Sequence, residues 1–448
     1  MLYIFIAREK ELDILNKKIN SNKFEFGILY GQKRVGKTRL LLEIFKNYNS
    51  IYNLCNEMGL EYNLKQLSDV VAKYINESFT FDSFDLLFDY LVKKSKTQKI
   101  IVIIDEFTYL MKTNNEIQSI LQNIIDHKLL NSNLKLIISG SHVGMIEDAL
   151  SYQKPLYGRS TFKMKIEPFD YYDASKFYLN ASNEDKVRFY SVFGGVPFYT
   201  DKIDDSLSVE ENVKSLIIED GAIFEDEVNF FLSQEVRSVA TYGKIINAIA
   251  NGATRLNEIS TKSGVNNTGT TSKYLDLLIT LGIVEKEYSF GESLNSKKTI
   301  YLVKDQLFRF FFRFIEKHKT QKVIMNTDYF YDSIIKEYLD EFVSFEFEKV
   351  CRDFLKRKYS MTIEEIGRYW YNDKNLKKDI EIDIMMIENK KLYAFECKWS
   401  DKPIGYNIKN NLENKVAHID NITLGYFSKK GFEEKDELCF DVNDLYNL

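Results

Sequence analysis

The sequence predicts a multidomain α/β protein whose first part is built on a parallel sheet. Strand-like and helix-like segments alternate between residues 24 and 141, which is the pattern of parallel strands joined by crossover helices. From residue 169 to residue 233 the pattern is mostly helical. The chain has 448 residues, a length that suggests about three domains.

A glycine-containing segment follows the first apolar strand of this sheet. The strand-like run 24–30 leads into Gly31-Gln32-Lys33-Arg34-Val35-Gly36-Lys37-Thr38, and the helix-like run 39–48 follows. The segment fits G-x-x-x-x-G-K-[ST], a pattern that binds phosphate between a strand and a helix. Its backbone N–H groups surround the β-phosphate, Lys37 reaches the β- and γ-phosphates, and Thr38 ligates Mg²⁺. The sequence therefore predicts a nucleoside triphosphate site.

A second strand predicts hydrolysis as well as binding. The apolar run 99–104 reads as a strand buried on both faces, and it ends in Asp105-Glu106. We expect Asp105 to hold the Mg²⁺ shell through water, and Glu106 to orient or deprotonate the attacking water. A third run, 134–138, ends in Ser139-Gly140-Ser141, whose polar tip would lie beside the γ-phosphate.

Composition limits the class of protein. With 44% hydrophobic and 28% charged residues the chain is globular. Its net charge of −5 leaves only local patches for contact with nucleic acid. The four cysteines are scattered without a CxxC pair, which is typical of a reducing compartment without a zinc site. No apolar run approaches the ~18 residues that span a bilayer, so we expect a cytoplasmic protein without membrane contact.

The segment from about 241 to 304 has the pattern of a winged helix-turn-helix. Helix-like runs at 242–250, 255–262 and 267–281 precede strand-like runs at 283–288 and 298–303. The third helix should expose side chains that bond bases or phosphates. These are Asn266, Asn267, Thr268, Thr270, Thr271, Ser272 and Lys273. On the wing Lys286, Lys297 and Lys298 favour DNA, whereas Glu285, Glu287 and Glu292 oppose it. A solvated face or contact with another domain is the alternative.

Two strand-like runs near the end of the chain carry a second group of charges. Runs 381–388 and 391–398 are joined by Asn389-Lys390, and Asn tolerates the positive φ of a tight hairpin turn. That turn places Asp383 opposite Glu396, and Glu381 opposite Lys398, on one face. Two acids ~5 Å apart repel unless a proton or a cation lies between them. A divalent metal would remove the repulsion.

Asp383 and Glu396-Cys397-Lys398 together have the form D-x₁₂-E-x-K, the signature of PD-(D/E)xK nucleases. In that class two acids hold Mg²⁺, and the lysine positions or activates the water that attacks a phosphodiester. Glu348, on the helix-like run 345–355, is a candidate for a further acidic ligand. The alternative is an ordinary hairpin edge with a solvated charge cluster, and such a fold does not guarantee cleavage.

The whole chain resembles the archaeal-type P-loop ATPases of the STAND group, which are AAA-like. The matching segments are 5–12, 104–106, 138–141, 155–159 and 194–197. The last part resembles the uncharacterised nuclease-like domain often fused to these ATPases, through 347–348, 366–370, 381–383 and 396–398. The resemblance implies that Arg159 approaches the γ-phosphate from its own or a neighbouring subunit, or else pins the lid. Ala7 stands where the family usually has a small flexible residue such as Gly.

These patterns predict four domains: an ASCE-type P-loop core (1–165), a helical lid (166–235), a winged helix-turn-helix (236–320) and an α/β domain like restriction endonucleases (328–448). We expect an ATP-hydrolysing molecular switch that uses Mg²⁺, with Mn²⁺ as an alternative at the nuclease-like site. DNA is the expected partner, bound by Asn267, Thr270, Lys273, Lys297 and Lys298. The rival is a nucleotide-dependent signalling scaffold with a protein-contacting winged helix and an inactive last domain. The DNA target, cleavage, self-association and adenine specificity stay open.

Overall fold

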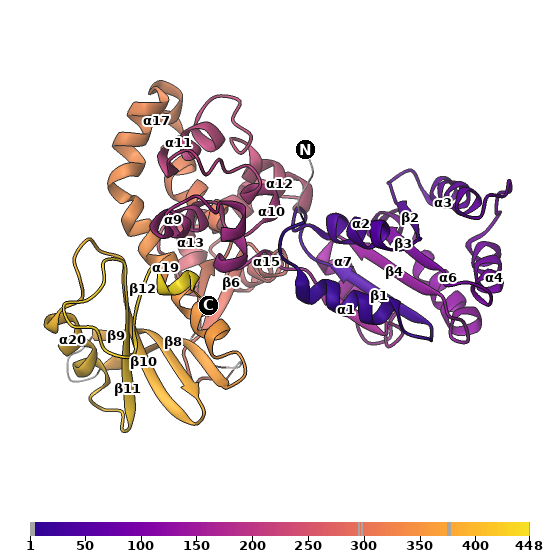
Figure 1. The fold of residues 1–448 in the computed structure, drawn as a ribbon. Helices are drawn as coiled ribbons and strands as arrows, with labels where there is room; N and C mark the ends of the chain where they lie inside the picture. Colours follow the sequence, from indigo (N-terminus) through magenta and orange to yellow (C-terminus); the bar gives the residue numbers. More distant parts are fainter. Residues whose placement is uncertain (1–4, 294–295, 297–298, 374–377, 448) are drawn as a thin grey trace. The chain divides into compact units, whose positions relative to one another are not determined.

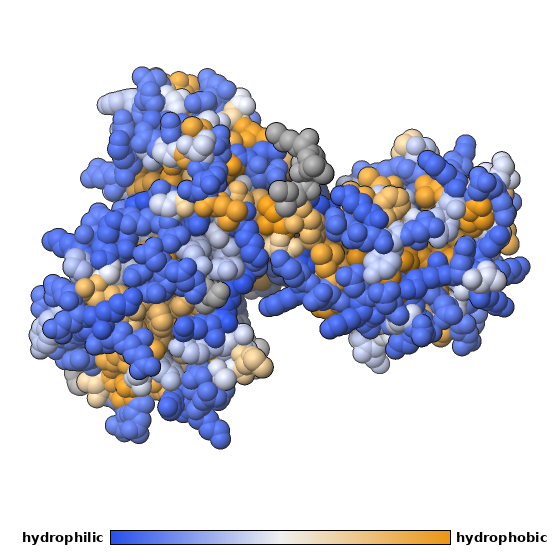
Figure 2. All heavy atoms as spheres, in the orientation of Figure 1, coloured by the Kyte–Doolittle hydropathy of each residue, from blue (hydrophilic) through white to orange (hydrophobic). Residues whose placement is uncertain are grey.

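The structure, a computed structural model, describes residues 5–293, 296, 299–373 and 378–447. It divides into two compact units, Met1–Pro168 and Phe169–Leu448 (Figure 1). Hydrophilic residues cover most of the visible face of each unit (Figure 2). Among the described residues, no helix combines the length and apolar character needed to cross a membrane.

A parallel sheet forms the centre of the first unit. Its strands are β1 (Glu25–Tyr30), β2 (Ile51–Leu54), β3 (Ile101–Asp105), β4 (Lys135–Gly140) and β5 (Phe162–Lys165). They are all parallel, in the order β2-β3-β4-β1-β5. Strand β4 lies between β1 and β3. The predicted parallel sheet is therefore confirmed.

Helices cover both faces of this sheet (Figure 1). On one face α1 (Glu9–Ile19) and α2 (Lys37–Asn47) pack on Ile101 and Ile103 of β3. On the other face α3 (Leu60–Ile75), α4 (Phe84–Ser95), α5 (Phe107–Thr113) and α6 (Ile117–Ile124) pack on Val102 and Ile104. Alternate residues of one strand thus enter two different cores, because successive side chains of a strand point to opposite faces. A π-helical turn, η1 (Ile125–Leu129), extends α6, and α7 (Val143–Ala149) follows β4.

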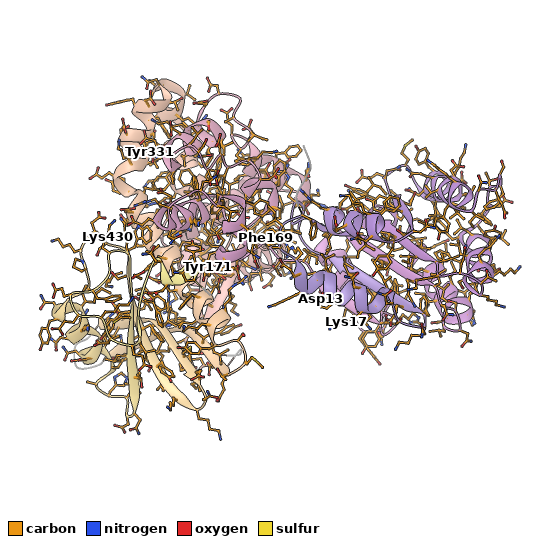
Figure 3. The ribbon with its side chains drawn as sticks, viewed as in Figure 1. Asp13, Lys17, Phe169, Tyr171, Tyr331 and Lys430 are labelled. Atoms are coloured by element: carbon orange, nitrogen blue, oxygen red, sulfur yellow. The ribbon has the colours of Figure 1, made fainter. Side chains whose placement is uncertain are left out.

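The second unit begins with helices. These are α8 (Tyr171–Ala174), α9 (Asn183–Phe193), α10 (Pro197–Thr200), α11 (Val209–Val213) and α12 (Glu227–Glu235). The unit begins at Phe169, which is labelled in Figure 3. Its N–H donates to the carbonyl of Gly195, in the turn before α10, at 2.8 Å. A Cβ at Gly195 would lie 1.8 Å from the Phe169 oxygen. Only glycine fits there without a shift of the backbone.

Three helices and an antiparallel pair of strands follow. The helices are α13 (Val239–Ala250), α14 (Leu256–Lys262) and α15 (Thr268–Thr280), and the strands are β6 (Val284–Tyr288) and β7 (Thr299–Val303). Further helical segments, among them α16 (Gln306–Phe310), α17 (Lys319–Ile324) and α18 (Thr327–Phe330), lead to the long helix α19 (Leu339–Lys358). The order of three helices and two strands is the one expected for residues 241–304.

A mixed sheet completes the second unit. Its strands are β8 (Ile363–Asp373), β9 (Lys378–Glu388), β10 (Lys391–Lys398), β11 (Ile422–Ser428) and β12 (Cys439–Asp441), in the order β12-β11-β10-β9-β8. Strands β8, β9 and β10 are antiparallel, whereas β10, β11 and β12 are parallel. Helix α20 (Tyr406–Val416) packs beside them. At the β9–β10 turn, Asn389 and Lys390 have φ 48° and 62°, and Lys391 faces Glu388, so the predicted hairpin and register are confirmed.

Helix α19 connects the parts of the second unit. Lys349 pairs with Glu285 of β6 at 2.5 Å, and Arg352 pairs with Glu287 at 2.7 Å. Near the end of the helix, Arg357 pairs with Asp170 and Asp173 at the start of the unit. The last residues also pack on that start, because the Tyr171 hydroxyl donates to the Leu445 carbonyl at 2.8 Å (Figure 3).

We predict that Gly195→Ala destabilises the second unit. The new methyl group would collide with a backbone oxygen, and overpacking of this kind costs about 1–3 kcal/mol or more. Urea unfolding measures the change. Gly243→Ala is the matched control, since its Cβ would meet only ring atoms of Phe312 at 3.9 Å and the helix would gain about 0.5–1 kcal/mol. Equal unfolding midpoints for wild type and Gly195→Ala would contradict the prediction.

Candidate functional site

The phosphate loop joins β1 to α2. Arg34 and Gly36 have φ 71° and 90°, so the loop turns sharply before the helix begins. A Cβ at Gly31 would lie 2.2 Å from the Ile166 oxygen. Lys37 is 4% exposed, and its Nζ donates to the carbonyls of Gly31 and Gln32, both at 3.0 Å. Charged phosphate oxygens compete well for this ammonium, because charge-assisted hydrogen bonds are roughly twice as strong as neutral ones.

The first turn of helix α2, just after the phosphate loop, is accessible to solvent at Thr38. Thr38 is exposed in the first turn of α2, whereas Val35 is buried and Gln32, Lys33 and Arg34 are half-buried. Thr38 therefore stands at a helix N-terminus, where backbone N–H groups and the helix dipole favour anions.

Asp105 ends β3 and is fully buried. Its Oδ1 accepts hydrogen bonds from the Ser139 hydroxyl and from the Glu106 N–H, and its Oδ2 accepts one from the Tyr52 hydroxyl at 2.8 Å. Burial and the charge of Asp105 raise the pKa of Tyr52 far above its usual value, so this hydroxyl keeps its proton and donates. Three donors on β2, β4 and the main chain thus fix the carboxylate orientation.

Glu106 lies beside the tip of β4. Its backbone has φ 54°, an uncommon value for a residue other than glycine. Its Oε2 accepts hydrogen bonds from the Ser141 hydroxyl at 2.8 Å and the Ser141 N–H at 3.1 Å. The Thr108 hydroxyl donates to the same oxygen at 3.4 Å. The structure thus brings together Asp105, Glu106, Ser139 and Ser141, as the strand ends predict.

Arg159 makes its contacts within the first unit. Its Nε and Nη2 donate to the two carboxylate oxygens of Asp126 at 2.8 and 2.7 Å. Its Nη1 donates to the carbonyls of Pro155 and Tyr157. The guanidinium lowers the pKa of Asp126. Contact with a γ-phosphate would require Arg159 to leave this bidentate pair, so its role at the nucleotide stays a prediction.

A second cluster of charges lies in the C-terminal sheet. Glu396 is 2% exposed, and its two oxygens pair with Lys398 at 2.6 Å and with Lys415 of α20 at 2.9 Å. The Cys397 N–H donates to the Asp383 carboxylate at 2.7 Å. Burial and the nearby Glu396 charge raise the pKa of Asp383. The charge of Glu396 thus acts on Asp383, although the β9–β10 ladder ends one pair before these two acids, at Phe395–Ile384.

Glu348 of α19 joins this cluster. Arg368 of β8 binds its carboxylate and also pairs with Glu381 at 3.1 Å. Burial and the charge of Asp383 raise the pKa of Glu348. The expectation that Glu381 faces Lys398 is corrected: the β9–β10 ladder ends at Phe395–Ile384, and beyond it each charge turns to a nearer partner.

The donor set suits a hard divalent cation, because Mg²⁺ and Mn²⁺ prefer carboxylate oxygens. Among the residues that the structure describes, however, no three His, Cys, Asp or Glu side chains are grouped closely enough to hold a metal ion. Lys398, Lys415 and Arg368 instead balance the acids, and a bound metal would have to displace at least part of these ion pairs.

At the start of α15 the predicted DNA contacts have different environments. Thr270 and Lys273 are exposed, but the Asn267 Oδ1 accepts the Thr270 N–H and so caps the helix. Thr271 was expected to be exposed and is fully buried, because it lies one helical turn before Leu275 on the buried stripe. Lys297 and Lys298 lie outside the described residues.

The wing strand β6 has two faces. Glu285 and Glu287 face α19 and are paired there, so they do not oppose DNA as the sequence suggested. Lys286 between them is exposed, and its ammonium lies over the rings of Tyr288 and Tyr301 at 5.2 and 5.9 Å. On this face of the strand Lys286 is thus the exposed side chain, and it packs over the half-buried Tyr288 and the buried Tyr301.

Comparison with known proteins places the chain in a family. Residues 5–203 match an ATPase domain predominantly from Archaea, and residues 311–416 match archaeal and bacterial proteins of unknown function. Uncharacterized protein MJECL04 of Methanocaldococcus jannaschii is 34% identical over 460 aligned residues, which cover 99% of this chain and 100% of that protein. The Walker-type ATPase PABY2304 of Pyrococcus abyssi has a similar fold, with a TM-score of 0.52 and 20% identity over 69% of this chain and 96% of that one.

A phosphate loop after β1 of a buried parallel sheet, together with Asp105-Glu106 at the end of β3, two strands away in the same sheet, defines a P-loop ATPase. The chain belongs to the archaeal-type ATPase family whose domain it contains. ATP is therefore its nucleotide ligand, and the chain is an ATPase.

We predict that Glu106→Gln binds ATP and hydrolyses it slowly. Loss of the group that orients water lowers turnover by about 10²-fold or more, while the phosphate loop is unchanged. Lys37→Ala should instead abolish binding, because the ammonium directed at the phosphates is lost. Calorimetry and phosphate release separate the two effects, with Lys46→Ala at the far end of α2 as control. Normal turnover in Glu106→Gln would show that the water is handled by another group.

Proposed function

We propose that the protein is an ATP-driven switch whose second unit acts on DNA. In this proposal residues 236–320 form a winged helix-turn-helix, and the C-terminal mixed sheet carries a metal-dependent nuclease-like site. The proposal is carried by Asp383, Glu396 and Lys398 on this sheet and by Glu348 on helix α19, whose charges act on one another and which would have to move closer together to hold a metal ion.

The acidic cluster supports metal-dependent phosphodiester chemistry. Asp383, Glu396 and Glu348 would hold Mg²⁺ or Mn²⁺, which would supply a polarised water and a charge opposite the phosphate. Burial, and after it the charge of Glu396, raise the pKa of Asp383, and a cation would remove the repulsion between the two acids. Although burial opposes its charge, Lys398 has its pKa raised by Glu396. It therefore stays protonated, which suits orienting the water and neutralising the phosphate better than removing a proton.

The wing supports contact with DNA. Two of its glutamates, Glu285 and Glu287, are paired with Lys349 and Arg352, and Lys286 on the wing and Lys273 on α15 are exposed. Positive side chains contact phosphates, and tyrosines flanking a lysine add hydrogen-bonding hydroxyls. If this module is a winged helix-turn-helix, its third helix α15 would be the recognition helix, and the exposure of Thr270 and Lys273 near its start supports that role.

ATP would act by changing the relative stability of two arrangements of the lid helices, residues 166–235, and of the modules that follow them. A bound nucleotide shifts such an equilibrium only by binding one arrangement better than the other. Hydrolysis would then return the protein to the second arrangement.

One observation favours a different function. Each acid of the C-terminal cluster already has a cationic or backbone partner: Lys398 and Lys415 for Glu396, Arg368 for Glu348, and the Cys397 N–H for Asp383. A network balanced in this way is stable without a metal. The second candidate is therefore a nucleotide-dependent signalling scaffold whose last domain binds a partner and cleaves nothing.

We predict that Mn²⁺ raises the melting temperature of the full chain through the C-terminal cluster. A ligand at 100 times its Kd stabilises the folded state by about 2.7 kcal/mol. The full chain is needed because α19, which carries Glu348, forms ion pairs with residues between 169 and 288. Asp383→Asn should lose the response to metal and be at least as stable without it, since the repulsion disappears.

Lys398→Ala provides the matched control for this prediction. It should keep the response to metal and lose DNA cleavage. If the wild-type chain ignores both Mg²⁺ and Mn²⁺ in scanning calorimetry, the nuclease proposal fails and the scaffold is favoured.

We predict further that Lys273→Ala and Lys286→Ala weaken DNA binding and reduce its dependence on salt. Each lost phosphate contact lowers the slope of log K against log salt by about 0.9. Lys46→Ala, in the first unit, is the control. Binding curves that match the wild type at every salt concentration would assign this module to protein contact.

A further inference from the structure

Arg8 occupies an unusual position just before α1. Ala7 and Arg8 have φ 57° and 71°, two successive residues in the left-handed region that favours glycine. Such backbone persists only where the surrounding structure fixes it. Here the result is that the Arg8 side chain, 9% exposed, is directed into the first unit.

The Arg8 guanidinium joins three segments. Its Nη1 pairs with Glu11 of α1 at 2.9 Å. Its Nη2 donates to the carbonyl of Val35 in the phosphate loop at 3.1 Å and to the carbonyl of Glu167 at 2.6 Å. One nitrogen therefore bridges the loop that binds phosphate and the segment by which the chain leaves the first unit.

The same exit segment also contacts the beginning of the phosphate loop. The Ile166 N–H donates to the Tyr30 carbonyl at 2.7 Å, and the Ile166 oxygen lies where a side chain at Gly31 would be. Residues 166 and 167 thus touch the loop at Gly31 and, through Arg8, at Val35. Glu167 is followed by Pro168, the last residue of the first unit.

Pro168 limits the backbone at the end of the exit segment. Proline fixes its own φ and restricts the residue before it, so Glu167 has few backbone conformations besides the one that Arg8 holds. Beyond Pro168, the Phe169 N–H donates to the Gly195 carbonyl.

We propose that Arg8 couples nucleotide occupancy of the phosphate loop to the backbone at Glu167 and Pro168. Phosphate oxygens compete with the Gly31 and Gln32 carbonyls for Lys37, and Val35 lies two residues before Lys37. A change in the direction of the Val35 carbonyl alters its bond to Nη2, which also holds Glu167. By linkage, the state of the exit segment must change nucleotide affinity by the same factor.

Hydrogen exchange on the full chain tests the proposal. A non-hydrolysable ATP analogue with Mg²⁺ should change exchange in residues 166–175 of the wild type by about fivefold or more. Arg8→Ala should still bind the analogue and should lose this change. Arg8→Lys should keep part of it, because one ammonium can donate to two carbonyls as Lys37 does.

Glu11→Ala is the matched control, since it removes the ion pair and leaves both carbonyl contacts. It should behave as the wild type. Three results would overturn the proposal: an unchanged nucleotide response in Arg8→Ala, loss of nucleotide binding in that variant, or an equal loss of the response in Glu11→Ala. The second would mean that Arg8 serves the loop itself, and the third that α1 carries the signal.

Discussion

Burial of both faces of the parallel sheet is the constraint on which the ATPase site depends. Every residue of β3 and β4 is buried, so groups that must meet a charged ligand are confined to the carboxyl ends of the strands. Asp105, Glu106 and Ser141 lie there for that reason. Because the strands are neighbours, each acid finds its orienting donor on the next strand, Ser139 or Tyr52 for Asp105 and Ser141 for Glu106.

Helix α19 has the corresponding role in the second unit, and it serves several partners at once. Phe347 and Phe354 pack into the C-terminal domain, Glu348 joins the acidic cluster, and Lys349 and Arg352 bind the wing. These residues lie within two helical turns of one another. A rotation of the helix that moved Glu348 closer to the other acids would therefore disturb the ion pairs of Lys349 and Arg352 with the wing. The wing and the C-terminal sheet are thus mechanically linked through α19.

The local features of both sites could be predicted from the sequence, but their partners could not. The spacing of glycines predicts the phosphate loop, the polar ends of apolar strands predict which side chains meet at the carboxyl edge of the sheet, and Asn389-Lys390 predicts the hairpin register. Tyr52, Lys415 and Arg368 escaped prediction because they come from other elements, and no periodicity specifies which elements are neighbours. The polar side chain of Thr271 predicts the exposed face of α15, but its spacing of four residues from the buried Leu275 places it on the buried face. The bidentate pair of Arg159 with Asp126 likewise joins distant segments.

The contact between Tyr171 and Leu445 has a consequence for biosynthesis. The two residues are 274 positions apart, and ribosomes add roughly 5–20 residues per second. The first unit contains all its own strands and can fold while the rest of the chain is still being made. Helix α8 must wait on the order of tens of seconds for the segment that covers it. During this interval the aromatic surface around Tyr171 lacks its cover, and transiently exposed surface of this kind is where a nascent chain is prone to aggregate.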